Sequence, residues 1–81
     1  MESDVFSVVR AEISKVLEVP ADQVTLESRF GDDLSADSVD LIEIVNSVED
    51  GFGVTIEEQD IYDIETVRQL VDLIERRRQP G

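Results

Sequence analysis

The 81-residue sequence contains no cysteine and no histidine, and each absence excludes a kind of chemistry. Without cysteine the chain forms neither disulfides nor zinc–thiolate sites. Without histidine it lacks the usual general base of enzymes and the commonest nitrogen ligand of metals. A chain this short buries only a modest core, and we expect residues 1–81 to form one small domain that no covalent cross-link supports.

The sequence also lacks a positively charged apolar leader and any apolar run of transmembrane length. These two absences favour a cytoplasmic protein that has no membrane partner.

Positive charge is scarce as well. Seven basic residues stand against twenty acidic ones, for a net charge of −13, and no lysine or arginine occurs from Phe30 through Val67. This distribution argues against nucleic acid as a partner, because phosphates need cations opposite them. A protein partner with a basic patch would instead be attracted to this surface.

Apolar residues recur at helical spacing in three segments, and a fourth fits a short helical turn. We predict helices over about residues 4–18, 38–50 and 66–77, with the short one over 57–62. The result is an all-α fold, a small four-helix bundle of three longer helices plus one short helix, with a long first loop. The predicted buried stripes consist of Phe6, Val9, Ile13, Val16 and Leu17, then Leu41, Ile44, Val45 and Val48, then Val67, Leu70, Val71 and Ile74.

Capping residues mark the predicted helix starts. Ser3 or Asp4 can cap the first helix, Asp37 the second and Thr66 the last.

Glycines, prolines and arginines mark the predicted ends. Gly51 and Gly53 flank Phe52 and predict a helix stop followed by a turn, and Val54 and Ile56 then form a short extended link. Arg76, Arg77 and Arg78 suit the negative end of the last helix dipole, and Pro80 and Gly81 are expected to fray.

The connection over residues 19–36 is long for a compact domain, so it needs anchors. Val24, Leu26, Phe30 and Leu34 are spaced through it, and we expect them to pack onto the helices.

Ser38, at the predicted start of the second helix, is the most informative residue for function. A serine nucleophile needs a base and an orienting group, and Ser38 has only carboxylates near it in sequence. Those anions would oppose a developing oxyanion, so the sequence argues against an enzyme.

A calcium loop beginning at Asp32 is also excluded. Glu43 would occupy its last ligand position, but Leu34 and Ala36 fall at ligand positions and Asp37 falls where glycine is needed. We predict no metal site.

Modification of Ser38 is compatible with its setting. The first turn of a helix tolerates an attached phosphodiester, because the N–H groups and the dipole there favour an anion. The residue types alone leave two readings open, an ordinary helix-start serine and a modified one.

The stretch from Phe30 to Phe52, which contains DDLSADSVDLIEIVNSVEDGF, resembles the phosphopantetheine-attachment region of acyl carrier proteins. The long first loop, the link through the short helix and the length of the final helix are similar to that family too. The resemblance implies that a phosphopantetheinyl transferase attaches a 4′-phosphopantetheine arm from coenzyme A to Ser38, with Asp37 assisting the magnesium-dependent transfer. The arm's thiol would then carry acyl groups as thioesters, and the chemistry would belong to the arm and the partner enzymes.

The resemblance also implies which surfaces matter. Basic patches on acyl-transfer, ketosynthase and related enzymes would meet the second helix, through Val39, Asp40, Ile42, Glu43, Asn46, Glu49 and Asp50. Acyl chains would enter between the helices, against Ile44, Val48, Ile56, Ile64 and Val67. The carrier is expected to act as a monomer.

Several positions depart from the family pattern. Ser35 stands where glycine is common, Asn46 replaces an apolar residue, and Ile61 and Tyr62 make the short helix bulkier. These departures leave type II fatty-acid, specialised lipid and polyketide biosynthesis all open. A peptidyl or aminoacyl carrier and an unmodified acidic adaptor are the alternatives.

Overall fold

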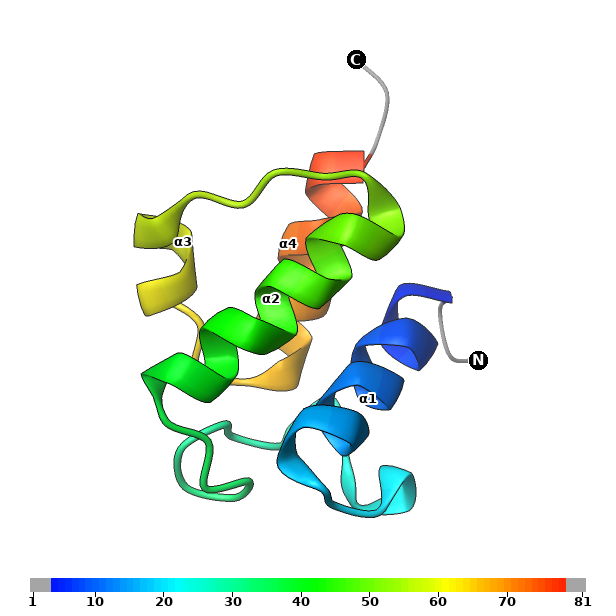
Figure 1. Cartoon of the computed structure of the whole chain (residues 1–81), viewed down its shortest axis with the longest axis vertical. Helices are drawn as coiled ribbons and strands as arrows, with labels where there is room; N and C mark the ends of the chain where they lie inside the picture. The colour runs from blue at the N-terminus through cyan, green and yellow to red at the C-terminus, as the bar shows by residue number, and fades with distance from the viewer. Residues whose placement is uncertain (1–3, 79–81) are drawn as a thin grey trace.

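Helices supply the regular structure of residues 4–78, the part of the chain that the computed structural model describes (Figure 1). Within that range there is no named strand, and Arg29 and Thr66 form an isolated antiparallel bridge. The predicted all-α fold is confirmed. Ser3, Pro80 and Gly81, for which a cap and a frayed end are predicted, lie outside the described residues. The elements are α1 (Asp4–Leu17), a 3₁₀ turn η1 (Ala21–Gln23), α2 (Ser38–Phe52), α3 (Glu58–Tyr62) and α4 (Val67–Arg78).

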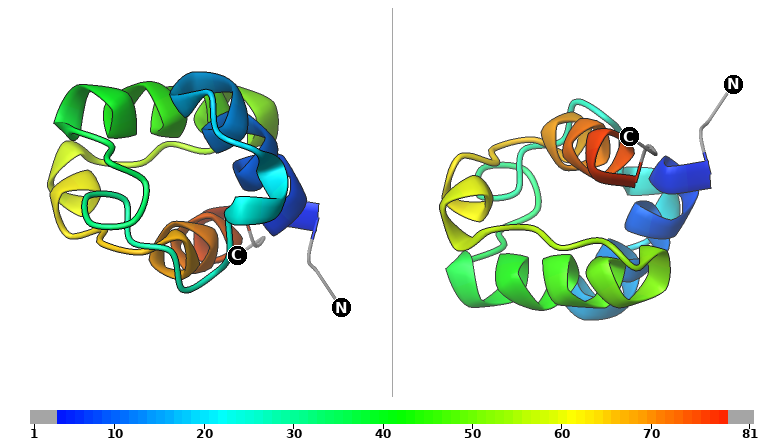
Figure 2. Two further views of the ribbon diagram at one scale, coloured as in Figure 1. Left: turned by 90° about the horizontal axis from the view of Figure 1, so that it is seen from below. Right: turned by 90° about the horizontal axis from the view of Figure 1, so that it is seen from above.

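The four α-helices surround a common apolar interior. Seen end-on, α2 lies opposite α4, while α1 closes one side and the short α3 closes the other (Figure 2). Every residue of the predicted stripes is buried except Val16 and Leu17, which pack against the core while remaining half-exposed. The stripes missed further buried residues, namely Val5, Ile61, Ile64 and Leu73.

The second helix runs two residues beyond its predicted end at about residue 50, and the predicted glycine stop falls at Gly53. Helix α2 continues through Gly51 to Phe52, and its C-terminal cap is Gly53, which has a φ of 66°. The Gly53 N–H donates to the Glu49 carbonyl at 2.8 Å, and the Val54 N–H donates to the same oxygen at 3.2 Å. Of these two glycines, only Gly53 adopts the left-handed conformation, in which glycine has little steric penalty.

The start of α4 carries a reciprocal cap. The Gln69 N–H donates to Thr66 Oγ1 at 3.3 Å, and Gln69 Oε1 accepts from the Thr66 N–H at 2.9 Å. The prediction that Thr66 caps this helix is confirmed, with Gln69 completing a capping box.

The long connection between α1 and α2 is anchored as predicted. Val24, Phe30 and Leu34 are buried, and Leu26 is partly buried against the core. The connection also accepts hydrogen bonds from the start of α4: the Val67 N–H donates to the Ser28 carbonyl at 3.0 Å, and the Arg68 N–H to the Leu26 carbonyl at 2.9 Å. These bonds satisfy N–H groups that have no partner within their own helix.

Candidate functional site

Asp37 caps α2, as the sequence predicted. Its Oδ1 accepts from the Asp40 N–H at 2.9 Å, and Asp40 Oδ2 accepts from the Asp37 N–H at 3.4 Å. In this capping box the carboxylates of Asp37 and Asp40 both accept backbone N–H groups at the start of the helix. Because Asp37 caps α2, the hydroxyl of Ser38, the first residue of the helix, is not needed as the cap.

Ser38 is exposed, and its hydroxyl has no hydrogen-bond partner in the described structure. A hydroxyl that neither caps the helix nor packs in the core is open to another enzyme. The arrangement suits covalent modification. No side chain of residues 4–78 hydrogen-bonds to this hydroxyl, as the base of a serine nucleophile would.

A hollow of about 280 Å³ lies beside Ser38. Its walls are joined by main-chain bonds: the Phe30 N–H donates to the Glu65 carbonyl at 2.9 Å, and the Phe30 carbonyl accepts from the Ala36 N–H at 2.7 Å. A flexible group attached to the Ser38 hydroxyl would have both room and an apolar surface to follow. The lining consists of Arg29, Phe30, Gly31, Asp32, Ala36, Asp37, Ser38, Leu41, Ile64 and Glu65.

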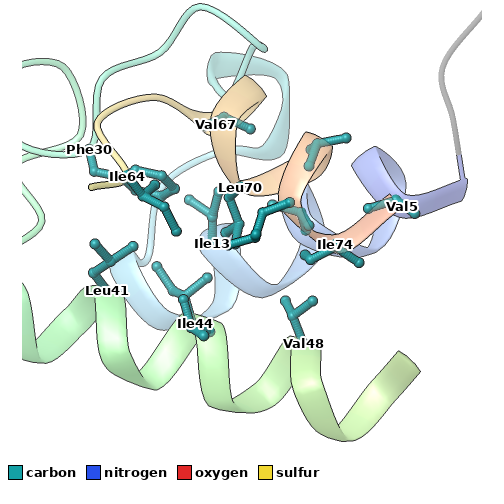
Figure 3. Packing of buried hydrophobic residues seen from close by; sticks show 14 of the residues in the cluster. Val5, Ile13, Phe30, Leu41, Ile44, Val48, Ile64, Val67, Leu70 and Ile74 are labelled. Carbon is teal, nitrogen blue, oxygen red and sulfur yellow. The ribbon is translucent and has the colours of Figure 1, made fainter. Parts of the chain in front are cut away.

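The residues predicted to contact an acyl chain are all buried: Ile44, Val48, Ile56, Ile64 and Val67. Of these, only Ile64 lines the hollow beside Ser38. Figure 3 shows Leu41 and Ile64 facing each other near Phe30, with Ile44 and Val48 following along α2. The hollow therefore borders one end of the main core.

The residues predicted to meet partners do not form one uniform surface. Val39 is 64% exposed, which is unusual for a valine in an amphipathic helix. Glu43, Asn46 and Asp50 are exposed as well. Ile42 packs partly against the core.

Two of the predicted partner residues already serve the fold. Asp40 belongs to the capping box. Glu49 is half-buried, and its Oε2 accepts from the Ile56 N–H at 2.8 Å. Their carboxylates are therefore less free to meet a basic partner than those of Glu43 and Asp50.

Two contributors to the hollow were missed by sequence reasoning, Arg29 and Glu65. Glu65 is distant from Ser38 in the chain, whereas Arg29 lies in the connection that leads into α2. Phe30 was predicted to anchor the connection to the helices. That prediction could have indicated that residues next to Phe30, such as Arg29, lie near the start of α2.

The short helix α3 carries an exposed phenol. Tyr62 donates to Glu58 Oε1 at 3.2 Å, and this hydrogen bond, reinforced by the carboxylate's charge, raises the pKa of Tyr62 above its ordinary value of 10.0.

Residues 4–78 contain no cluster of three or more acidic, cysteine or histidine side chains placed to hold a metal ion. No helix in the same range has the length and apolar character needed to cross a membrane.

Residues 7–74 match the family model described as "Phosphopantetheine attachment site". An acyl carrier protein from Borrelia garinii subsp. bavariensis is 39% identical over 79 residues, which cover 96% of this chain and 99% of the relative. One from Thermotoga maritima is 42% identical over 74 residues, which cover 91% of each chain.

A solved structure of the acyl carrier protein from Enterococcus faecalis is similar in both fold and sequence. It superposes with a TM-score of 0.76 at 40% identity, over 91% of this chain and 94% of the other. Carriers of this kind hold phosphopantetheine and are not themselves enzymes. The length of the match and the level of identity together show that this chain belongs to the acyl carrier protein family.

Proposed function

We propose that Ser38 is the residue to which 4′-phosphopantetheine is attached, and that the loaded chain delivers acyl thioesters to separate enzymes in the cytoplasm. The observation that carries this assignment is the exposed Ser38 hydroxyl, which has no hydrogen-bond partner among residues 4–78 while Asp37 caps the helix. The arm supplies a terminal thiol, the group that the chain itself lacks.

The acyl chain is proposed to enter through the hollow beside Ser38. Leu41 and Ile64 stand at its inner side, and Ile44, Val48, Ile56 and Val67 belong to the core that a longer chain would reach. Because those side chains are already close-packed, a long acyl chain must separate them to enter. Short chains would meet only the hollow.

Docking is proposed to use the exposed side of α2. Val39 offers an apolar contact, and Glu43 and Asp50 offer free carboxylates to a basic patch. Such contacts act mainly on association and weaken with salt. Enzymes of type II fatty-acid, specialised lipid or polyketide biosynthesis are the proposed partners.

Attachment can be tested by intact mass. The unmodified protein is incubated with coenzyme A, magnesium and a broad-specificity phosphopantetheinyl transferase, beside Ser38→Ala and Ser35→Gly variants. A single phosphopantetheine increment is expected in the wild type and in Ser35→Gly, and none in Ser38→Ala. No increment on the folded wild type would discard the assignment and favour an acidic adaptor that is never modified.

Docking can be tested with charge reversals on loaded protein. Glu43→Lys and Asp50→Lys are expected to lower kcat/KM for an acyl-transfer enzyme about tenfold, with a smaller effect at high salt, since one such contact contributes on the order of 1 kcal/mol. Glu12→Lys on α1 is the control. Equal losses in all three variants would point to net charge instead of a surface on α2.

A further inference from the structure

Among residues 4–78, Arg29 is the one cationic residue that lines the hollow beside Ser38, and the proposed function gives it no role. The same lining includes the carboxylates of Asp32, Asp37 and Glu65. A phosphodiester on Ser38 would add another negative charge to this setting. Coulomb repulsion at such short range favours a cation beside the new anion.

The backbone of Arg29 is fixed relative to the hollow. Its N–H donates to Asp33 Oδ2 at 2.8 Å, and its carbonyl accepts from the N–H groups of Asp33 and Leu34, both at 3.0 Å. On its other side it pairs with Thr66 in the isolated bridge. The next residue, Phe30, carries the main-chain bonds that join the walls of the hollow. The Cα atom of Arg29 is thus held at the edge of the hollow.

The Arg29 guanidinium, by contrast, is free to change partner. Its Nη1 lies 3.3 Å from Asp32 Oδ2, and the two side chains are 64% and 76% exposed. An exposed ion pair of this kind contributes little, so exchanging it for another anion has a small energetic cost. A guanidinium also presents a planar fork of N–H donors that matches the oxygens of a phosphate.

We propose that Arg29 binds the phosphodiester of the phosphopantetheine arm and so directs the arm over the hollow. The inference rests on the proposed attachment to Ser38. Arg29 contacts the phosphate and orients the arm, and it takes no part in acyl transfer.

The test compares the unloaded and loaded wild-type protein by NMR, after intact mass has shown that the arm is attached. The Arg29 Nε–Hε resonance is expected to shift on loading, while that of Arg68, which pairs with Glu27, stays in place. Added salt should reduce the Arg29 shift, because the contact is exposed. This comparison uses the unchanged chain and does not depend on how a variant folds.

Loaded variants supply the second readout, the ³¹P resonance of the arm. Arg29→Gln is expected to shift it from the wild-type position, Arg68→Gln to leave it there, and Asp32→Asn, which removes the competing carboxylate, to shift it in the direction opposite to Arg29→Gln. An Arg29 resonance that does not respond to loading, or a ³¹P resonance that Arg29→Gln leaves unchanged, would overturn the inference. Failure of the arm to attach at all would show up earlier, in the mass, and would instead refute the assignment of Ser38.

Discussion

Glu49 on α2 and Ile56 before α3 are joined by a hydrogen bond in which Glu49 Oε2 accepts from the Ile56 N–H at 2.8 Å. This bond is part-buried, and it ties the extended link after α2 back onto that helix. The carboxylate therefore has a structural role, whatever it contributes to docking.

Replacing Glu49 with alanine is expected to lower the free energy of unfolding by about 1–2 kcal/mol, because it leaves the Ile56 N–H without its acceptor. Glu49→Gln keeps an acceptor oxygen and is expected to lose less. Urea denaturation measures both, with Asp50→Ala as the control for lost charge. Equal stability of Glu49→Ala and Asp50→Ala would show that the bond contributes nothing.

The two glycines that flank Phe52 should respond to alanine in opposite directions. Gly51 lies within α2, and a Cβ added there would meet no other atom within 4 Å, so Gly51→Ala is expected to stabilise the protein by about 0.5–1 kcal/mol. Gly53 has a φ of 66°, so Gly53→Ala is expected to destabilise it by about 1 kcal/mol. The stabilities are compared through the midpoints of urea unfolding, provided that the dependence of the unfolding free energy on urea concentration (the m-value) is the same in all variants. Changes of the same sign would contradict the position of the helix end.

Ser35 adopts a φ of 55°, a left-handed conformation that disfavours residues with a Cβ. This conformation explains why glycine suits the position two residues before the capping aspartate. Ser35→Gly is expected to raise the free energy of unfolding by about 0.5–1 kcal/mol, net of the extra entropy of glycine in the unfolded chain. The control is Ser35→Ala, which keeps a Cβ and should bring no such gain. Thermal melts measure both variants. Equal melting temperatures of Ser35→Ala and Ser35→Gly would show that Ser35 does not adopt the left-handed conformation.

Tyr62 is the single tyrosine of the chain, so its ionisation can be followed by ultraviolet absorbance. We expect a pKa above 10.0, because the phenol donates to Glu58 and that carboxylate's charge opposes the phenolate. Glu58→Gln should move the pKa down towards 10.0, whereas Glu57→Gln should leave it nearly unchanged. An unchanged pKa in Glu58→Gln would argue against this contact in solution.

The raised pKa of Tyr62 also has a consequence for stability. The folded state holds the phenol proton more tightly than the unfolded state does. The contribution of the pair is therefore fully present below the ordinary pKa of 10.0 and is lost as the pH rises through the raised value.

Arg77 on α4 and Asp60 on α3 form an ion pair at 2.7 Å that ties the short helix to the bundle. A double-mutant cycle with Arg77→Gln and Asp60→Asn is expected to give a coupling of roughly 0.5–1 kcal/mol that falls with salt. The pair of Arg68 and Glu27 is more exposed and should couple less. A larger coupling in that second pair would rule out burial as the cause of the difference.

The sequence was sufficient for the features that depend on local chemistry. The cap at Asp37, the cap at Thr66 and the anchoring of Phe30 all follow from residue type and spacing along a short stretch. Helical periodicity likewise located the stripes of α2 and α4, because burial on one face leaves a regular apolar pattern.

Features that depend on contacts between distant segments could not be predicted from the sequence. The half-buried position of Glu49 required knowing that the link to α3 folds back beside α2. The hollow beside Ser38 required knowing that Arg29 and Glu65 meet there. The end of α2 was missed for a local reason: both Gly51 and Gly53 are permitted helix stops, and only the backbone distinguishes them.

The main-chain bonds of Phe30 to Glu65 and to Ala36 join segments that are synthesised at different times. The hollow beside Ser38 needs Ile64 and Glu65 as walls, and the ribosome adds these residues long after the serine itself. On the proposed attachment, a transferase that contacts this surface meets its complete form only after residues through Glu65 have joined the fold.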